Sequence, residues 1–282
     1  HMFSRLGIEV RFAEDNSPES LAKLIDAKTS AVFCESISNP VGSIADIEGI
    51  AEMAHKHEVP LIVDNTVATP ILVKPIDYGA DIVVHSLTKY MGGHGNSLGG
   101  IIVDSGRFPW AKYPERFPMM NTPEAAYHGV VYATDMGEEG FITRSRTVPM
   151  LNTGSPLSPF NAFLILQVIE TLALRMERHC ENALAVANYL ESHSQVSSVN
   201  YGGLSSSPYY DLAKKYTDGK PSALLSFDIK GGFDAGVRFY DSLKLFKRLV
   251  NIGDAKSLAA HPASTTHRQL SESELAAAGI TT

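Results

Sequence analysis

Two short apolar runs in the first hundred residues lead directly into polar side chains with chemical functions. The run Leu61-Ile-Val63 ends at Asp64, and the run Ile82-Val-Val84 leads into the sequence His-Ser-Leu-Thr-Lys, which ends at Lys89. Apolar runs of this length, bounded by turn residues, are typical of buried strands. A carboxylate and an amine are therefore expected at the ends of neighbouring strands.

Helical patterns separate the predicted strands. Asp46 is expected to cap a helix with apolar side chains at helical spacing, and further strands are expected at Ala31–Glu35 and Gly100–Val103. The order strand, helix, strand implies parallel pairing with right-handed crossovers, and unbroken apolar runs are typical of strands covered on both faces. The sequence therefore predicts an α/β fold with a mostly parallel sheet covered by helices on both faces.

Polar residues gather where ligands bind in such sheets, beyond the carboxyl ends of the strands. A lysine amine can condense with the aldehyde of pyridoxal 5′-phosphate, a carboxylate can keep its ring nitrogen protonated, and hydroxyls can bind its phosphate. We predict these roles for Lys89 as the catalytic, cofactor-bound lysine, for Asp64, and for Ser86 with Thr88. The alternatives are a turn carboxylate or helix cap at Asp64 and an ordinary surface loop around Lys89.

A glycine-dense loop from Met91 to Gly100 follows the lysine. Glycines allow the backbone to approach a ligand or a neighbouring segment closely. The sequence has no Walker A pattern and no strand-linked G-x-G-x-x-G pattern. Nucleotide phosphate binding is therefore not the better explanation of this loop.

Together these residues resemble the Cys/Met-metabolism family of fold-type I pyridoxal phosphate enzymes, and the resemblance extends from the first residues to the last. Within the family, the chain is similar to the O-acetylhomoserine sulfhydrylases. Its glycine loop reads Gly-Gly-His94-Gly95-Asn96-Ser97, whereas the cystathionine synthases and lyases typically have Gly-His-Ser-Asp. An aromatic-rich insertion from Phe108 to Tyr132 is a second similarity, with a surface excursion around its own small core as the alternative interpretation.

The resemblance implies a transferase of methionine biosynthesis. Acetate leaves O-acetylhomoserine, and sulfide or methanethiol takes its place to give homocysteine or methionine. Lys89 would hold the cofactor and shuttle protons. Asn39 would lie against the phenolic oxygen of the cofactor and the substrate, and Ser257 would help to hold the substrate carboxylate. The resemblance also implies a homo-oligomer, a tetramer built from dimers.

Two alternatives to this function stay open. A cystathionine γ-synthase or a methionine γ-lyase would share the cofactor residues and differ in the glycine loop and the insertion. The other alternative is an inactive α/β fragment with a structural role only. Compared with the family pattern, the chain lacks the N-terminal third, which holds much of the phosphate site, and the arginine that clamps the substrate carboxylate. On this basis we expect incomplete cofactor binding and no activity from this chain alone.

The patterns also predict the domain organisation. Residues 1–158 are expected to be part of the large cofactor-binding domain, and residues 159–192 to form a long linking helix that begins at Ser158 and Pro159. Residues 193–282, with short strands and one helix, are expected to form a smaller α+β domain that is incomplete at its end.

Composition limits the remaining function classes. The net charge of −7 argues against nucleic acid or an anionic membrane as a partner. No run approaches the length of a membrane span, no signal peptide is recognisable, and Cys34 and Cys180 provide no disulfide framework, so a cytoplasmic location is expected. The ten histidines lack zinc-like spacing with cysteines or acids, so no metal site is predicted.

Overall fold

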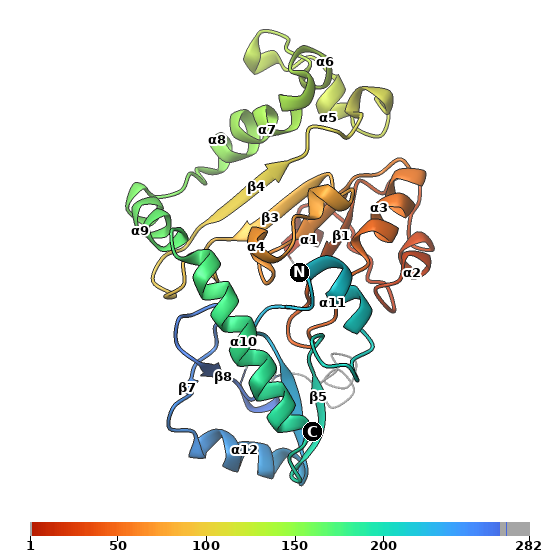
Figure 1. Ribbon diagram of the computed structural model, residues 1–282. Helices are drawn as coiled ribbons and strands as arrows, with labels where there is room; N and C mark the ends of the chain where they lie inside the picture. Colours follow the sequence, from red (N-terminus) through yellow and green to blue (C-terminus); the bar gives the residue numbers. More distant parts are fainter. Residues whose placement is uncertain (1, 266–268, 270–282) are drawn as a thin grey trace.

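The computed structural model describes residues 2–265 and residue 269, and a four-stranded sheet lies at its centre (Figure 1). The strands β1 (Val32–Glu35), β2 (Leu61–Asp64), β3 (Ile82–Ser86) and β4 (Gly100–Asp104) lie side by side in that order. The first three pair in parallel, whereas β4 pairs antiparallel with β3. The predicted α/β fold with a mostly parallel sheet is confirmed.

One face of the sheet carries the main core. Leu61, Val63 and Val83 alternate with residues of the opposite face and are buried. They pack with apolar side chains of the helices that connect and follow the strands. These helices are α2 (Pro18–Ala22), α3 (Ile47–Lys56), α4 (Thr69–Leu72), α9 (Pro159–Ile169), α10 (Leu172–Glu191) and α11 (Tyr210–Thr217).

Asp46 is the N-cap residue of α3, as expected, although its side chain makes no capping hydrogen bond. The Asp46 carboxylate instead accepts a 2.5 Å hydrogen bond from the Tyr216 hydroxyl and a 3.3 Å hydrogen bond from Lys215 Nζ. The Tyr216 hydroxyl accepts a 3.1 Å hydrogen bond from the N–H of Glu48. Because a tyrosine of α11 satisfies this helix-start N–H, the Asp46 carboxylate connects α3 to α11.

The aromatic insertion covers part of the second face. Ile82 of β3 packs with Trp110, Phe117 and Tyr132, which are all buried. The Trp110 ring stacks on Phe141 with centroids 5.4 Å apart. The insertion contains α5 (Pro118–Asn121) and ends where α6 (Tyr132–Asp135) begins, and α7 (Gly140–Ser145) and α8 (Leu151–Thr153) follow it. The insertion therefore has a small core of its own, and the sheet has helices on both faces, as predicted.

The edge strands are less covered than the sequence indicated. Ile101 and Ile102 of β4 keep 45% and 48% of their surface exposed, and Phe33 of β1 keeps 56%. Each of these strands has one neighbour among the described strands. The expectation that Ala31–Glu35 is buried and that Gly100–Val103 is covered on both faces is therefore wrong, because an apolar run does not distinguish an edge strand from a central one.

The stretch 159–192 forms two helices instead of the single linking helix that was predicted. α9 begins at Pro159 after Ser158, as expected, but the axes of α9 and α10 meet at 63°. At the break, the Thr171 hydroxyl donates a 3.1 Å hydrogen bond to the Val168 carbonyl. Such a side-chain hydrogen bond competes with the helical backbone ladder and gives a physical reason for the break.

α10 leads to a smaller α+β part in the lower half of Figure 1. It contains the antiparallel pair of β5 (Val196–Asn200) and β6 (Ser226–Ile229), the helix α12 (Gly232–Ser242), and the parallel pair of β7 (Lys247–Arg248) and β8 (Leu258–Ala259). An irregular segment, residues 249–257, connects β7 to β8. Most of the predicted domain 193–282 is thus described, and its end lies outside the described residues.

Short elements complete the described chain. They are α1 (Met2–Arg5), the 3₁₀ turns η1 (Pro75–Tyr78), η2 (Trp110–Lys112), η3 (Ala125–Tyr127), η4 (Gly137–Glu139) and η6 (Pro262–Ser264), and the π turn η5 (Arg146–Met150). Within residues 2–265, no single helix has the length and apolar composition of a membrane span, and only the bent pair α9 and α10 meets that test together. Cys34 and Cys180 are free thiols whose burial raises their pKa to about 12 and about 11.

Candidate active site

Asp64 and Ser86 are the last residues of the parallel strands β2 and β3. Asp64 pairs with Val84, so its side chain lies on the same face of the sheet as those of Val84 and Ser86. Lys89 follows in the loop after β3. Three of the predicted site residues are therefore placed together at one edge of the sheet by the strand register.

Hydrogen bonds fix the turn after Asp64 against β3. One Asp64 carboxylate oxygen accepts a 2.9 Å hydrogen bond from the N–H of Thr66. The Thr66 hydroxyl accepts a 2.7 Å hydrogen bond from the N–H of Ser86. The second carboxylate oxygen of Asp64 has no donor among the described residues, so it is available to a ligand that carries an N–H group.

The Lys89 amine is half-buried and points toward the irregular segment 249–257. Its Nζ donates a 3.3 Å hydrogen bond to Oδ1 of Asn251. The Lys89 backbone is fixed as well, because its N–H bonds to the Ser86 carbonyl at 3.2 Å and its carbonyl accepts from the N–H of Gly93 at 2.8 Å. The sequence analysis missed Asn251. Its only signal is an Asn-x-Gly-Asp turn after an apolar run.

Thr88 and Ser86 differ in what their hydroxyls contact. The Thr88 hydroxyl accepts a 3.2 Å hydrogen bond from the N–H of Gly99, which closes the base of the glycine loop. The Ser86 hydroxyl makes no hydrogen bond within the part of the chain that the structure describes. The Thr88 hydroxyl thus already has a partner within the chain, and the phosphate contacts of both residues stay predictions.

The glycine loop and segment 249–257 pack against each other without room for side chains. A Cβ on Gly253 would lie 2.4 Å from the Tyr90 nitrogen, and a Cβ on Gly95 would lie 2.9 Å from Nδ2 of Asn251. The N–H of Ala255 donates a 2.8 Å hydrogen bond to the Gly93 carbonyl. The small C-terminal part of the chain thus directly contacts the loop that follows the lysine.

Asn39 and Ser257 are both exposed. Asn39 follows β1 at the same edge of the sheet, is joined to Pro40 by a cis peptide bond, and donates its N–H to Glu35 Oε2 at 3.1 Å. Ser257 ends segment 249–257, and its carbonyl accepts a hydrogen bond from the N–H of Lys247 at 2.9 Å. No hydrogen bond connects either side chain to Lys89 or Asp64 among the described residues, and their predicted substrate contacts stay predictions.

His85 is a buried histidine beside the candidate site. It pairs with Ile101 on β4, so its side chain lies on the face of the sheet opposite to Ser86. Burial lowers the pKa of His85, although the Asp64 charge opposes this shift. Its Nδ1 has no hydrogen-bond partner within the described chain. Burial therefore favours the neutral form of the His85 imidazole beside Asp64.

The groups at this edge fit pyridoxal phosphate. The fit rests on three groups: the half-buried amine of Lys89 would meet the aldehyde, the second carboxylate oxygen of Asp64 the ring nitrogen, and the Ser86 hydroxyl the phosphate. Asn251 presents a neutral amide to the amine. Within the described residues, no three His, Cys, Asp or Glu side chains converge to form a metal site.

Comparison with known proteins agrees with this chemistry. Residues 1–282 match the family described as Cys/Met metabolism PLP-dependent enzyme, and the chain belongs to that family. The predicted family and its cofactor, pyridoxal 5′-phosphate, are confirmed.

Individual relatives are similar over almost the whole chain. It is 49% identical to a homocysteine synthase from Schizosaccharomyces pombe, over 98% of this chain and 65% of that protein. It is 47% identical to an O-acetyl-L-homoserine sulfhydrylase from Corynebacterium glutamicum, over 99% of this chain and 64% of that protein. The chain therefore spans less than two thirds of the length of these relatives.

A solved structure extends the comparison to three dimensions. It is a crystal structure from Campylobacter jejuni, described as an O-acetylhomoserine (thiol)-lyase with an N′-pyridoxyl-lysine-5′-monophosphate residue. It aligns with a TM-score of 0.91 and 44% identity, covering 100% of this chain and 67% of that one. The fold of the chain is therefore that of a pyridoxal phosphate enzyme.

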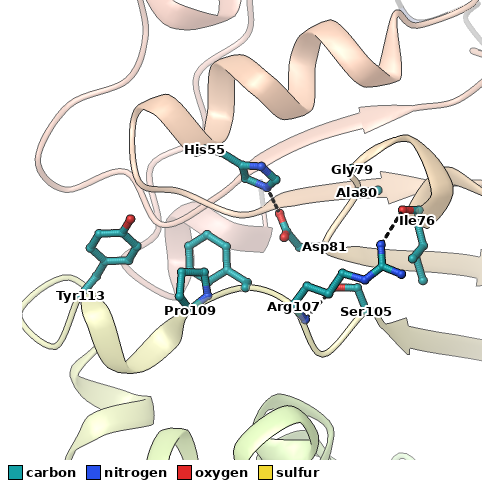
Figure 2. A pocket seen from close by; sticks show the side chains of 10 residues that line it. His55, Ile76, Gly79, Ala80, Asp81, Ser105, Arg107, Pro109 and Tyr113 are labelled. Carbon is teal, nitrogen blue, oxygen red and sulfur yellow. Dashed lines mark hydrogen bonds and ion pairs between the residues drawn. The ribbon is translucent and has the colours of Figure 1, made fainter.

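A cavity of about 300 Å³ lies at the opposite edge of the sheet (Figure 2). Asp81 precedes β3 and Ser105 follows the antiparallel strand β4, so both lie at the amino ends of the parallel strands. The buried Asp81 carboxylate accepts 2.8 Å hydrogen bonds from Nε2 of His55 and from the N–H of Leu61. Asp81 therefore joins α3 and β2 to the start of β3, away from the lysine.

This pair predicts a pH-dependent component of stability. The hydrogen bond to Asp81, with the attraction of its charge, raises the pKa of His55 in the folded chain. A raised folded-state pKa adds stability that is fully present below the unfolded value of about 6.5 and is lost as the pH rises through the folded value. Urea unfolding from acid to mildly alkaline pH measures the free energy of unfolding at each pH, and His55→Gln should remove this component. The component is at most about 1 kcal/mol, because the histidine is partly exposed.

The control is His57→Gln at the end of the same helix, which forms no ion pair within the described chain. It should keep the pH-dependent component of stability that the His55–Asp81 pair supplies. A His55→Gln variant whose free energy of unfolding follows the parental pH curve would contradict the assignment.

Proposed function

We propose that the protein catalyses a pyridoxal phosphate-dependent γ-replacement on O-acetylhomoserine, with sulfide or methanethiol as the incoming group. The observation that carries the proposal is the Lys89 amine, held by Asn251 at the same edge of the sheet as the free carboxylate oxygen of Asp64. The names of the relatives, homocysteine synthase and O-acetyl-L-homoserine sulfhydrylase, support this substrate class.

Each residue has a role that follows from its position. Pyridoxal phosphate, when bound, would withdraw electron density from the α carbon of the substrate. Lys89 would hold the cofactor covalently and, once released, would take up and return protons as the nearest amine. Asp64 would keep the ring nitrogen protonated by presenting its free carboxylate oxygen. Ser86, with Thr88 as a weaker candidate, would donate a hydroxyl to the phosphate.

Asn251 would direct the Lys89 amine without removing its reactivity. An amide oxygen accepts a hydrogen bond from the amine but carries no charge that would fix a proton on it. A carboxylate at the same position would favour the protonated, unreactive ammonium. The neutral partner is therefore suited to a lysine that must act as a base. We infer substrate-side roles for Asn39 and Ser257, whose exposed positions leave their side chains free to contact a ligand.

The competing reactions differ in their products. The full-length protein, loaded with cofactor, should form homocysteine from O-acetylhomoserine and sulfide. Two competing reactions should be at least about tenfold less efficient: cystathionine formation from O-acetylhomoserine and cysteine, and 2-oxobutyrate formation from methionine. A tenfold ratio corresponds to a difference in transition-state free energy of about 1.4 kcal/mol. Liquid chromatography of the products measures all three reactions. Faster cystathionine formation would identify a cystathionine γ-synthase instead, and faster 2-oxobutyrate formation a methionine γ-lyase. If none of the three products forms, a structural role is favoured.

The two assigned side chains make a separate prediction. Borohydride reduction followed by peptide mapping should place the pyridoxyl group on Lys89, and Lys89→Ala should abolish turnover. Asp64→Asn should bind the cofactor but lower kcat by roughly 100-fold or more, because the amide cannot stabilise a protonated ring nitrogen. Lys112→Ala, a change in the exposed insertion, is the matched control and should leave both results unchanged. A pyridoxyl group on another lysine would refute the assignment.

We also propose that the protein assembles as a homo-oligomer, a tetramer built from dimers. The aromatic insertion does not supply a suitable contact surface, because its main aromatic side chains are buried within the chain. The better candidate is the exposed apolar surface of α9, where Phe160, Phe163 and Leu166 keep 68%, 54% and 65% of their surface exposed.

Light scattering should therefore give a multimer for the full-length protein. Leu166→Asp should shift it toward smaller species, because a carboxylate would be buried in the contact. Leu174→Asp, at an equally exposed position of α10, should not. A monomer for the active parent protein would contradict the proposal.

A further inference from the structure

A guanidinium contacts the backbone directly after the candidate catalytic lysine. Arg175 of α10 donates a 2.7 Å hydrogen bond from Nη1 to the carbonyl of Tyr90. The same guanidinium donates a 3.1 Å hydrogen bond from Nη2 to the carbonyl of Val168, near the end of α9. One planar group thus connects Tyr90, the residue directly after Lys89, with Val168 near the end of α9.

Arg175 also takes part in the break between the two helices. Its Nε donates a 3.2 Å hydrogen bond to the hydroxyl of Thr171. That hydroxyl in turn donates to the Val168 carbonyl, the acceptor that Arg175 shares. The guanidinium that binds the Tyr90 carbonyl therefore also takes part in the hydrogen bonds at the 63° bend between α9 and α10.

The charge of Arg175 has no acidic partner among the described residues. The guanidinium is half-buried, and burial lowers its pKa. A guanidinium used for a surface ion pair would face a carboxylate, whereas this one donates to two carbonyls and a hydroxyl. Its rigid planar fork can reach two acceptors at once, which the single ammonium of a lysine cannot do with the same geometry.

The surroundings leave the lysine loop little freedom on this side. A Cβ on Gly93 would lie 3.0 Å from Nη1 of Arg175, so the loop passes directly over the guanidinium. The buried Tyr90 ring packs edge-on against His179, one helical turn beyond Arg175, with centroids 5.6 Å apart. On the other side of the loop, segment 249–257 contributes Asn251 and Gly253.

We propose that Arg175 is a positioning residue, whose guanidinium sets the place of the Lys89 amine by fixing the Tyr90 carbonyl to the bend between α9 and α10. Its hydrogen bonds go to the Tyr90 and Val168 carbonyls and the Thr171 hydroxyl, and none goes to Lys89 or Asp64 among the described residues. The orientation of the two helices and the position of the amine are thereby set by the same hydrogen bonds. This inference rests on the proposed function, because it assigns Lys89 as the reacting amine.

The test uses the full-length protein loaded with pyridoxal 5′-phosphate, with Arg175→Lys and Arg175→Ala as variants. Both should lower kcat by about 100-fold, since a misplacement of about 1 Å can cost that much, and should change KM little. Both should also alter the visible circular dichroism of the bound cofactor. Guanidinium chloride at low millimolar concentration should partly restore the kcat and the spectrum of Arg175→Ala. Arg178→Ala, an exposed arginine on the same helix that pairs with Glu181, is the matched control.

Hydrogen exchange separates this inference from the proposed function. In the Arg175 variants, the peptide that contains Lys89 to Gly93 should exchange faster than in the parent or in Arg178→Ala, whether or not turnover is detected. If the parent shows no γ-replacement while exchange and the cofactor spectrum respond to Arg175, the proposed reaction fails and the positioning role stands. The positioning role would be overturned if the Arg175→Lys variant had the same hydrogen-exchange rates as the parent protein. It would also be overturned if this variant had the same cofactor spectrum and kcat as the parent protein. If Arg175→Ala does not fold, Arg175→Lys decides.

Discussion

Parallel pairing of β2 with β3 is the constraint on which the site depends. The register Asp64 to Val84 places the carboxylate of one strand and the hydroxyl of Ser86 on one face, and the chain then turns into the loop that carries Lys89. The Thr66 hydroxyl, bonded to the N–H of Ser86, fixes this arrangement beyond the last ladder hydrogen bond. A shift of one residue in this register would move Asp64 to the opposite face.

The position of the lysine depends on a second level of structure. Two parts of the chain that are distant in sequence contact its loop, α10 through Arg175 and segment 249–257 through Asn251. The first fixes the backbone after Lys89, and the second fixes the amine. The small C-terminal part and the helix that leads to it therefore do more than complete the fold, because they define where the amine can act.

The sequence predicted what depends on local pattern and missed what depends on distant contacts. The strands that end at Asp64 and Ser86 and the parallel order followed from apolar runs separated by helical spacing. Asn251 could not be found in this way, because it lies 162 residues from Lys89 and belongs to an irregular segment. The break after α9 and the use of the Thr88 hydroxyl by Gly99 also arise from individual hydrogen bonds, which residue patterns do not encode.

The central claim is that this edge of the sheet binds pyridoxal phosphate through Lys89. Titration of the full-length protein with the cofactor, followed by visible absorbance, tests it most directly, because covalent attachment to an amine changes the absorbance of the free aldehyde. The account predicts a saturable band in the parent protein that is absent in Lys89→Ala. No saturable change in the parent, or the same band in Lys89→Ala, would contradict it.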